Sequence, residues 1–338
     1  MDSFTYEALP MRVVFGSGAL SRLAEETDRL GLHRVLVLST PEQRDLADRV
    51  AAVLGERAAG VFDQARPHVP VPTVAAAAHA AAELNADGCV AAGGGSTIGL
   101  GKALARQLDL PVVALPTTYA GSEMTPIWGL TENHRKQTGR DRKVLPRSVV
   151  YDPDLTASLP ATVAATSGLN AIAHAVEALY APDASPVIAA MAEQGVRDLA
   201  TSFTGASALR GAWLCGACLG ATTMGLHHKL CHVLGGMLDL PHAETHAILL
   251  PHVAAFNLPA AAAAAAALSR ALHTDDPAAS LAKLAAGTGA PANLAALGVT
   301  EPDLARVVDE VLANPYANPR PVHRADLESL LHQAFRPR

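Results

Sequence analysis

The first half of the chain alternates short apolar runs with segments of helical periodicity, and this alternation limits the fold more than any other feature. The apolar runs have the length and composition of buried strands, and they are residues 12–15, 33–38, 59–63, 86–92 and 111–115. Helical spacing of Leu, Val and Ala occupies residues 19–30, 41–54, 72–84 and 97–108. This alternation predicts a parallel sheet covered on both faces, a doubly wound, Rossmann-like α/β domain.

The second half has a different texture. After one more expected strand at residues 148–151, the sequence is rich in Ala and Leu with helical spacing and contains no further clear strand. The segment 151–160 carries the prolines and aspartates of a linker. We therefore expect an α/β dinucleotide-binding domain at 1–155 and an all-α substrate and catalytic domain at 156–338.

Composition excludes several classes of function. With 17% charged residues and a net charge of −6, the chain has no field that favours nucleic acid or an acidic membrane surface. Neither a membrane span nor a secretory leader is evident in the sequence. Cys215 and Cys218 lie in an apolar run, which favours buried thiols in a packed helix over a redox pair. We expect a globular cytoplasmic protein.

A glycine-rich turn follows the strand at 86–92. Gly93, Gly94, Gly95 and Ser96 precede a helix, where backbone N–H groups meet a phosphate at the positive end of the helix dipole. The spacing is not G-x-G-x-x-G, so a plain turn remains the alternative.

Two further loops are expected beside this turn, because the carboxyl ends of parallel strands meet at one edge of the sheet. Residues 116–123, PTTYAGSE, follow the strand at 111–115 and are rich in hydroxyls and small side chains. Ser39 and Thr40 follow the strand at 33–38, where either one is expected to cap the next helix. Neither an acidic residue nor an arginine stands beside them, so the choice between NADH and NADPH stays open.

Histidines are concentrated between residues 225 and 252. This stretch holds six of the fourteen histidines of the chain, namely His227, His228, His232, His242, His246 and His252. The pairs 228/232 and 242/246 are spaced i,i+4, which places each pair on one face of a helix. Imidazole is both a metal ligand and a group that titrates near neutral pH. A metal cage and a metal-free site for acid–base chemistry and anion binding are both open.

An earlier helix adds polar groups to this picture. Asn170 and His174 are i,i+4, and Glu177 lies on nearly the same face of an alanine-rich segment. Combined with His228 and His242, they would form a cage of one amide and three imidazoles, in which neutral Asn is a poor ligand for a divalent cation, although the three imidazoles of His174, His228 and His242 alone can still hold zinc. A set of hydrogen-bonded core histidines is the alternative.

Basic side chains are expected near the substrate. Lys229 stands inside the histidine-rich stretch and suits an anionic substrate, although a surface lysine is the alternative. The basic run 134–143, HRKQTGRDRK, favours a solvated loop. One or two of its side chains, Arg140 above all, would suit a dicarboxylate.

Together these segments resemble the iron-containing alcohol dehydrogenase-like superfamily and, within it, the maleylacetate reductase group. The motifs that carry the resemblance are FGSGAL, GGGSTIGLGKALA, LPTTYAGSEMTPIWGLTE, SGLNAIAHAVEALYAP, LHHKLCHVLGG and LPHAETHAILLPH. The resemblance covers nearly the whole chain. It implies a dehydroquinate synthase-like fold of two domains, the active site in the cleft between them, and a homodimer.

The resemblance also implies roles for single residues. The positions that hold iron or zinc in metal-dependent members match Asn170, His174, His228 and His242, so the Asp of that set is missing here. Gly99 stands at the acidic position of the pattern GGGS-x-x-D-x-x-K, of which Lys102 remains. Both departures are typical of the maleylacetate reductase group, which requires no metal. Residues implied on the cofactor side are Ser39, Gly94, Gly95, Ser96, Thr117, Thr118, Ser122 and Lys143.

The implied activity is an oxidoreductase acting on a CH–CH group: NADH or NADPH reduces the C=C bond of maleylacetate to 3-oxoadipate in the catabolism of aromatic compounds. His242 and His232 are the expected polarising or protonating groups. The expected carboxylate-binding residues are His174, His228, Lys229, Tyr119 and Arg140, with Asn170 beside the substrate. Three alternatives remain: a metal-dependent alcohol dehydrogenase or aldehyde reductase, a dehydroquinate synthase-like lyase, and a non-catalytic nucleotide-binding protein.

Overall fold

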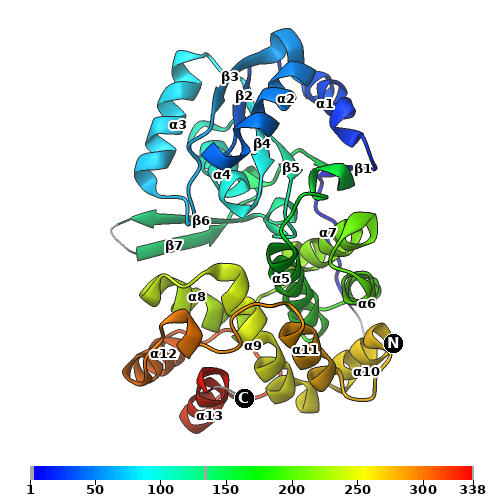
Figure 1. The fold of residues 1–338 in the computed structure, drawn as a ribbon, viewed down its shortest axis with the longest axis vertical. Helices are drawn as coiled ribbons and strands as arrows, with labels where there is room; N and C mark the ends of the chain where they lie inside the picture. The colour runs from blue at the N-terminus through cyan, green and yellow to red at the C-terminus, as the bar shows by residue number, and fades with distance from the viewer. Residues whose placement is uncertain (1–3, 133–134, 337–338) are drawn as a thin grey trace. The chain divides into compact units, whose positions relative to one another are not determined.

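The computed structural model describes residues 4–132 and 135–336, and the chain divides into two compact units. The nucleotide unit comprises Leu9–Leu159 together with Thr204–Leu209. The helical unit comprises Pro160–Phe203 and the chain from Arg210 onward, joined by the N-terminal residues up to Ala8. Figure 1 shows both units, with labels on most of their helices and strands.

The nucleotide unit is built on a parallel sheet. Within the described residues six strands pair in the order β1-β8-β5-β4-β2-β3, every pair parallel. In that order they are Arg12–Phe15, Ser148–Tyr151, Val112–Pro116, Gly88–Gly93, Val35–Leu38 and Ala58–Phe62. After β3 the chain crosses back to the other side of β2 and forms β4 there. β2, β4 and β5 are therefore neighbours, and their carboxyl ends lie along one edge of the sheet. The doubly wound fold expected from the sequence is confirmed.

Alternating side chains of the central strands bury two faces of this sheet. Leu36 and Leu38 of β2 pack in one core cluster, with residues of α3 (Val71–Glu83) and α4 (Gly95–Leu108). Val35 and Val37 pack in another, with residues of α1 (Leu23–Arg29) and α2 (Arg44–Leu54). Each such side chain contributes about 1.5–3 kcal/mol when it is fully buried. This burial on both faces explains why the strands have continuous apolar runs.

A two-stranded hairpin stands where the sequence favoured a solvated loop. β6 (Ile127–Glu132) and β7 (Arg135–Arg140) pair antiparallel from Ile127 opposite Arg140 to Glu132 opposite Arg135. Residues 135–140 of the basic run are therefore a strand, and His134 lies outside the described residues. The prediction failed because β7 contains no alternating apolar residues that would indicate a strand. It is paired with β6 through the backbone. The guanidinium of Arg106 lies 4.0 Å from the centre of the Trp128 ring, which ties β6 to α4.

The helical unit is organised around α5 (Ala161–Leu179), which is buried almost continuously from Ala164 to Ala178. The helices that follow are α6 (Pro186–Thr201), α7 (Gly205–Ala221), α8 (Leu226–Leu238), α9 (His242–Asn257), α10 (Ala262–Leu272), α11 (Pro277–Ala286), α12 (Glu301–Ala313) and α13 (Arg324–Phe335). Small residues bring α6 and α7 together: a Cβ on Gly211 would lie 2.8 Å from the carbonyl oxygen of Gly195. Cys215 and Cys218 are buried in α7 as free thiols, as expected. Among the described residues, the helices lack the combination of length and hydropathy that a bilayer crossing needs.

Candidate active site

The glycine-rich turn joins β4 to the N-terminus of α4. Gly94 is the N-cap and the helix begins at Gly95, so the first backbone N–H groups of α4 have no partner within the helix. A Cβ on Gly93 would lie 2.4 Å from Thr97 Oγ1, and one on Gly94 would lie 3.1 Å from the side chain of Thr118. Gly94, Gly95 and Ser96 are partly exposed. The turn thus offers uncovered N–H groups at the positive end of a helix dipole, which suits a phosphate.

The neighbouring loops form a hydrogen-bonded rim. Gln43 Nε2 donates to Thr117 Oγ1 at 3.0 Å, which connects the segments after β2 and β5. Ser39 is buried and its hydroxyl donates to the Gln43 carbonyl at 3.1 Å. Thr40 occupies the expected cap position, because it is the N-cap of the 3-10 turn Pro41–Gln43 that leads into α2, but its side chain makes no capping hydrogen bond. Thr118, beside Gly94, and Ser122 remain partly exposed.

Three residues assigned from the sequence differ in their surroundings. The ammonium of Lys143 is 2.8 Å from the carboxylate of Asp109. Asp109 caps the C-terminal end of the 14-residue helix α4, about 20 Å from the glycine turn at its other end. Tyr119 is fully buried, and burial raises the pKa of its phenol. Arg140 is exposed on β7.

A buried polar cluster supports the loop at 116–123. Lys102 Nζ donates to Thr125 Oγ1 at 2.9 Å and to the Ile127 carbonyl at 2.7 Å. Tyr151 Oη donates to Glu123 Oε1 at 2.7 Å. Burial lowers the pKa of Lys102 to about 7, against the opposing charge of Glu123, and burial raises the pKa of Glu123. Lys102 therefore fastens the start of β6 to α4.

In the helical unit, Glu177 of α5 holds the beginning of α8. Its carboxylate accepts the backbone N–H groups of Gly225 at 2.8 Å and His227 at 2.6 Å. A negative charge at a helix N-terminus is stabilising. The same carboxylate is 2.5 Å from His228 Nδ1. A Cβ at Gly225 would lie 2.8 Å from Glu177 Oε1, so only glycine allows this approach.

The Glu177 contact fixes the orientation of the His228 ring. Burial alone would raise the pKa of Glu177, but His228, His227 and the Gly225 N–H lower it below its usual value, so the group is a carboxylate. A carboxylate accepts the proton of Nδ1, which directs Nε2 of His228 away from Glu177. His228 Nε2 is buried and has no hydrogen-bond partner among the described residues.

The rings of His228, His174 and His246 come from three helices and lie close to one another. The ring of His174, on α5, stacks on His228 with centroids 5.2 Å apart, and the ring of His246, on α9, lies 5.1 Å from His228. The His174 and His246 centroids are 6.3 Å apart. Burial lowers the pKa of both His174 and His246 well below the usual value, with neighbouring imidazoles acting in the same direction. Both rings are therefore neutral, and Asn170 Oδ1 is buried without a partner in the described structure.

Cationic and aromatic groups border the cluster. Lys229 is buried, and its ammonium lies 5.5 Å from the centre of the Tyr316 ring. His232 Nδ1 lies 3.4 Å from Tyr316 Oη. His242 is exposed at the start of α9, with its ring 4.3 Å from His246. The structure thus gathers every histidine assigned from the sequence in one region of the helical unit.

Comparison with known proteins identifies the family. The family model described as "Iron-containing alcohol dehydrogenase" matches residues 10–153. The model described as "Fe-containing alcohol dehydrogenase family, C-terminal" matches residues 164–335. The chain belongs to the iron-containing alcohol dehydrogenase family. It is 53% identical to a maleylacetate reductase of Sphingobium indicum, across 98% of this chain and 97% of the relative. It is 52% identical to one from Pseudomonas sp. strain P51, across 98% of both.

Solved structures agree with this assignment. A maleylacetate reductase from Agrobacterium tumefaciens is 48% identical with a TM-score of 0.95, covering 99% of both chains. Another, from Rhizobium sp. strain MTP-10005, is 49% identical with a TM-score of 0.94 and the same coverage. The chain is accordingly an NAD(P)H-dependent oxidoreductase of the iron-containing alcohol dehydrogenase family.

The metal position of the iron-containing alcohol dehydrogenase family is altered in this chain. Asn170 supplies a neutral amide at the position where the resemblance implies a carboxylate in metal-dependent members. Both oxygens of the nearby carboxylate, Glu177, are already engaged by N–H groups. The ring of His246 stands beside His174 and His228 within the group. The set therefore lacks an anionic ligand, which weakens it for a divalent cation, although three imidazoles alone can hold zinc.

Space is short at Gly99, the second position where the resemblance implies an acidic residue in metal-dependent members. A Cβ on Gly99 would lie 2.7 Å from Val69 Cγ2. Val69 therefore fills the space that the acidic side chain of the pattern would need.

Glu177, His227 and His246 were seen in the sequence but not assigned to the site. Their partners come from different helices, so only the i,i+4 relation of His242 and His246 could have indicated one of them.

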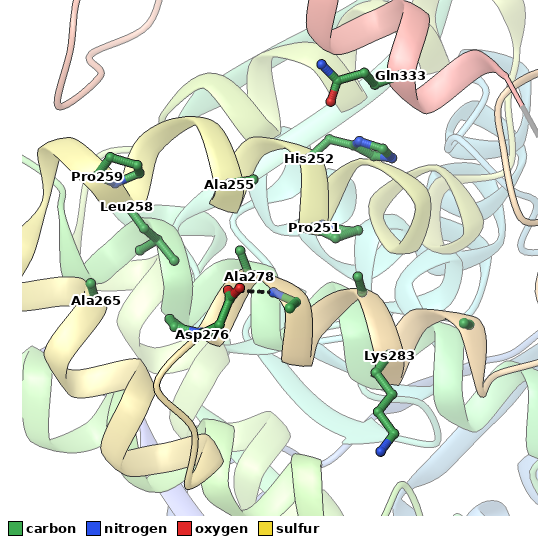
Figure 2. A pocket seen from close by; sticks show the side chains of 14 residues that line it. Pro251, His252, Ala255, Leu258, Pro259, Ala265, Asp276, Ala278, Lys283 and Gln333 are labelled. Atoms are coloured by element: carbon green, nitrogen blue, oxygen red, sulfur yellow. Dashed lines mark hydrogen bonds between the residues drawn. The ribbon is translucent and has the colours of Figure 1, made fainter. Parts of the chain in front are cut away.

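The large cavity of the helical unit lies away from the histidine cluster. Its volume is about 780 Å³, and its lining is chiefly Ala and Pro side chains of α9, α10 and α11 (Figure 2). Cavity size alone would make it a default site. Asp276 points into it but accepts the backbone N–H of Ala279 as the cap of α11. The clustered histidines, Lys229 and Glu177 do not line this cavity. We therefore place the candidate active site at the histidine cluster.

Proposed function

We propose that the protein reduces the C=C bond of maleylacetate, giving 3-oxoadipate, and that the reaction requires no metal. The observation that carries the proposal is the buried imidazole group around His228, oriented by Glu177 and lacking a carboxylate ligand at Asn170. The full-length similarity to maleylacetate reductases supports the choice of substrate.

The nucleotide unit has the features that an NADH or NADPH pyrophosphate needs. Gly94, Gly95 and Ser96 present backbone N–H groups, and the absent Cβ at Gly94 leaves the approach open beside Thr118. When bound, the reduced nicotinamide supplies a hydride to the alkene carbon β to the ketone of the substrate.

His228 is the residue best suited to meet the charge that develops on the ketone oxygen. The carboxylate of Glu177 contacts Nδ1 of His228, which leaves Nε2 available to meet an enolate oxygen. Burial keeps His174 and His246 neutral, so these rings are less suited to stabilising a negative charge on the oxygen. This geometry favours His228 over His232 and His242 for polarising the ketone.

A proton must then reach the carbon α to the ketone. His232 is partly exposed and lies beside Tyr316, and His242 is exposed, so either ring exchanges its proton with water. A positioned imidazole contributes about 10²–10⁴-fold to such a transfer. We keep His232 and His242 as the proton donors of the proposal.

Lys229 is suited to a substrate carboxylate. Its ammonium is buried beside Tyr316, and within the described residues no carboxylate forms an ion pair with it. A buried cation without an anion is costly, and an anionic ligand would relieve that cost. Asn170, with its unpartnered Oδ1 and its amide donor, is a second polar contact for the substrate.

The test is NADH and NADPH oxidation by metal-depleted enzyme, with maleylacetate in one series and simple aldehydes in the other. The proposal expects turnover of maleylacetate that survives a chelator and negligible turnover of aldehydes. A metal-dependent aldehyde reductase would show the reverse, with activity restored by iron or zinc. A dehydroquinate synthase-like lyase would consume no reduced cofactor, and a binding protein would bind it without turnover.

A further inference from the structure

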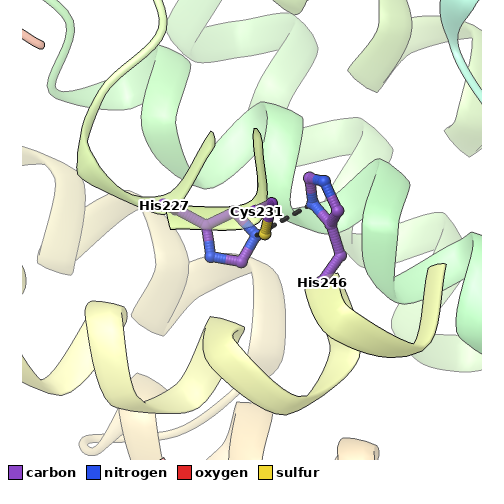
Figure 3. A group of neighbouring side chains, drawn as sticks. All are labelled: His227, Cys231 and His246. Atoms are coloured by element: carbon purple, nitrogen blue, oxygen red, sulfur yellow. Dashed lines mark hydrogen bonds between the residues drawn. The ribbon is translucent and has the colours of Figure 1, made fainter. Parts of the chain in front are cut away.

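A second group of potential ligands lies beside the Glu177–His228 pair. His227 and Cys231 are i,i+4 on α8, and His246 faces them from α9 (Figure 3). All three side chains are buried. This group is distinct from the metal position of the family, because it contains none of Asn170, His174, His228 or His242.

The three side chains converge on a common point. His227 Nε2 is 2.9 Å from His246 Nδ1 and 3.7 Å from Cys231 Sγ. The three ligand atoms all lie within 4.8 Å of one another. Two imidazole nitrogens on one tetrahedral zinc are about 3.3 Å apart, and a nitrogen and a thiolate sulfur about 3.6 Å apart, given the usual zinc–ligand distances. The two distances from His227 Nε2 differ from these values by only a few tenths of an ångström, whereas His246 Nδ1 and Cys231 Sγ, which lie within 4.8 Å, would have to approach by up to about 1.2 Å.

We propose that His227, Cys231 and His246 form a binding site for a thiophilic divalent cation of the zinc type. Two imidazoles and one thiolate are the ligands that zinc prefers, and hard cations such as magnesium would be rejected. Three protein ligands leave one position of a tetrahedron for water. Binding exchanges the hydrogen bond between His227 and His246 for two metal–nitrogen bonds and releases the thiol proton of Cys231 to solvent.

His246 connects this site to the imidazole cluster. Its Nδ1 faces His227, while its Nε2 is buried and without a hydrogen-bond partner in the described structure. A cation on Nδ1 leaves the ring proton on Nε2, so occupancy fixes His246 as a donor. The site orients a ring of the cluster and takes no part in hydride transfer.

Cobalt titration of the metal-depleted full-length protein tests the proposal, because cobalt bound to thiolate gives a charge-transfer band in the near ultraviolet. We expect one equivalent per chain with this band and displacement by zinc. Cys231→Ser should lose the band. Cys218→Ser, which removes another buried thiol on α7, should keep it, as should His174→Ala, which alters the family's metal position.

The proposal is overturned if cobalt does not bind, or binds without the band. It is also overturned if the band survives in Cys231→Ser or disappears in His174→Ala. Should Cys231→Ser fail to fold by circular dichroism, X-ray absorption at the zinc edge of the wild-type protein decides instead. One sulfur and two imidazole nitrogens per zinc support the site, and a sulfur-free shell contradicts it. No readout depends on maleylacetate turnover, so the outcome is separate from that of the proposed function.

Discussion

The glycine turn of the nucleotide unit and the histidine cluster of the helical unit are made in different ways. The turn uses backbone N–H groups, and its glycines matter because of the side chains they lack. The cluster uses particular side chains from three helices, with Glu177 holding both a helix end and an imidazole. A backbone site tolerates variation around it as long as the approach stays open. A site of coupled buried side chains depends on each member.

The largest expected effect follows from removing the central imidazole. His228→Ala should lower kcat/KM for maleylacetate by about 10²–10⁴-fold, because the group oriented by Glu177 is lost. NADH affinity should change little, since the glycine turn is untouched. His79→Ala, at an exposed histidine of α3, is the matched control and should leave kinetics unchanged. Wild-type kcat/KM in His228→Ala would refute the assignment.

The cluster should also make stability depend on pH. Burial lowers the pKa of His174, His246 and His227, the last to about 3. As pH falls, these histidines therefore take up protons in the unfolded chain before they do so in the folded protein. Their contribution to the free energy of unfolding is fully present above the unfolded pKa of about 6.5 and decreases below it. Between pH 6.5 and 5.5 each ring should lower the free energy of unfolding by about 1 kcal/mol, or about 3 kcal/mol for the three.

Urea unfolding at the two pH values measures this loss in each unit. Trp213 of α7 reports the helical unit and Trp128 of β6 the nucleotide unit. In single-tryptophan variants, Trp128→Phe and Trp213→Phe, the free energy reported by Trp213 should fall more than that reported by Trp128. A pH-independent Trp213 transition would contradict the neutral, buried state of these rings.

A smaller effect is expected at the glycine turn. Gly94→Ala adds a Cβ 3.1 Å from the Thr118 side chain and covers the N–H approach, so the Kd for NADH should rise roughly tenfold, equivalent to about 1.4 kcal/mol. The control, Gly287→Ala after α11, adds a Cβ at an ordinary 3.5 Å contact. Isothermal titration gives both affinities. A Kd unchanged in Gly94→Ala would mean that the phosphate lies elsewhere.

Almost no effect is expected from Lys143→Ala. The Lys143 ammonium pairs with Asp109 at the far end of α4 from the glycine turn. The Kd for NADH and for NADPH should therefore stay within about twofold, which is less than a fully formed phosphate contact contributes. A tenfold or larger rise for either cofactor would return Lys143 to the cofactor site.

The sequence predicts the sheet well, because buried parallel strands have continuous apolar runs such as VLVL at Val35–Leu38. The hairpin β6–β7 was not predicted, because β7 has no alternating apolar residues. Its two strands are held together by backbone pairing. Histidine density indicated the region of the site. The choice of partners did not follow, since Glu177, His228 and His246 meet only after three helices pack.

Exposure was equally beyond the sequence at several assigned residues. Nothing in PTTYAGSE indicates that Tyr119 is fully buried while Thr118, its neighbour, is partly exposed. The ion pair of Lys143 with Asp109 joins residues 34 positions apart. Such contacts depend on how elements pack and leave no periodic trace.

The most direct test of the central claim is to locate deuterium in the product of metal-depleted enzyme supplied with maleylacetate and deuterated reduced nicotinamide. The account predicts 3-oxoadipate with deuterium on the carbon that was β to the ketone and a solvent proton on the α carbon. Deuterium on a carbinol carbon, or turnover only after iron or zinc is restored, would contradict it.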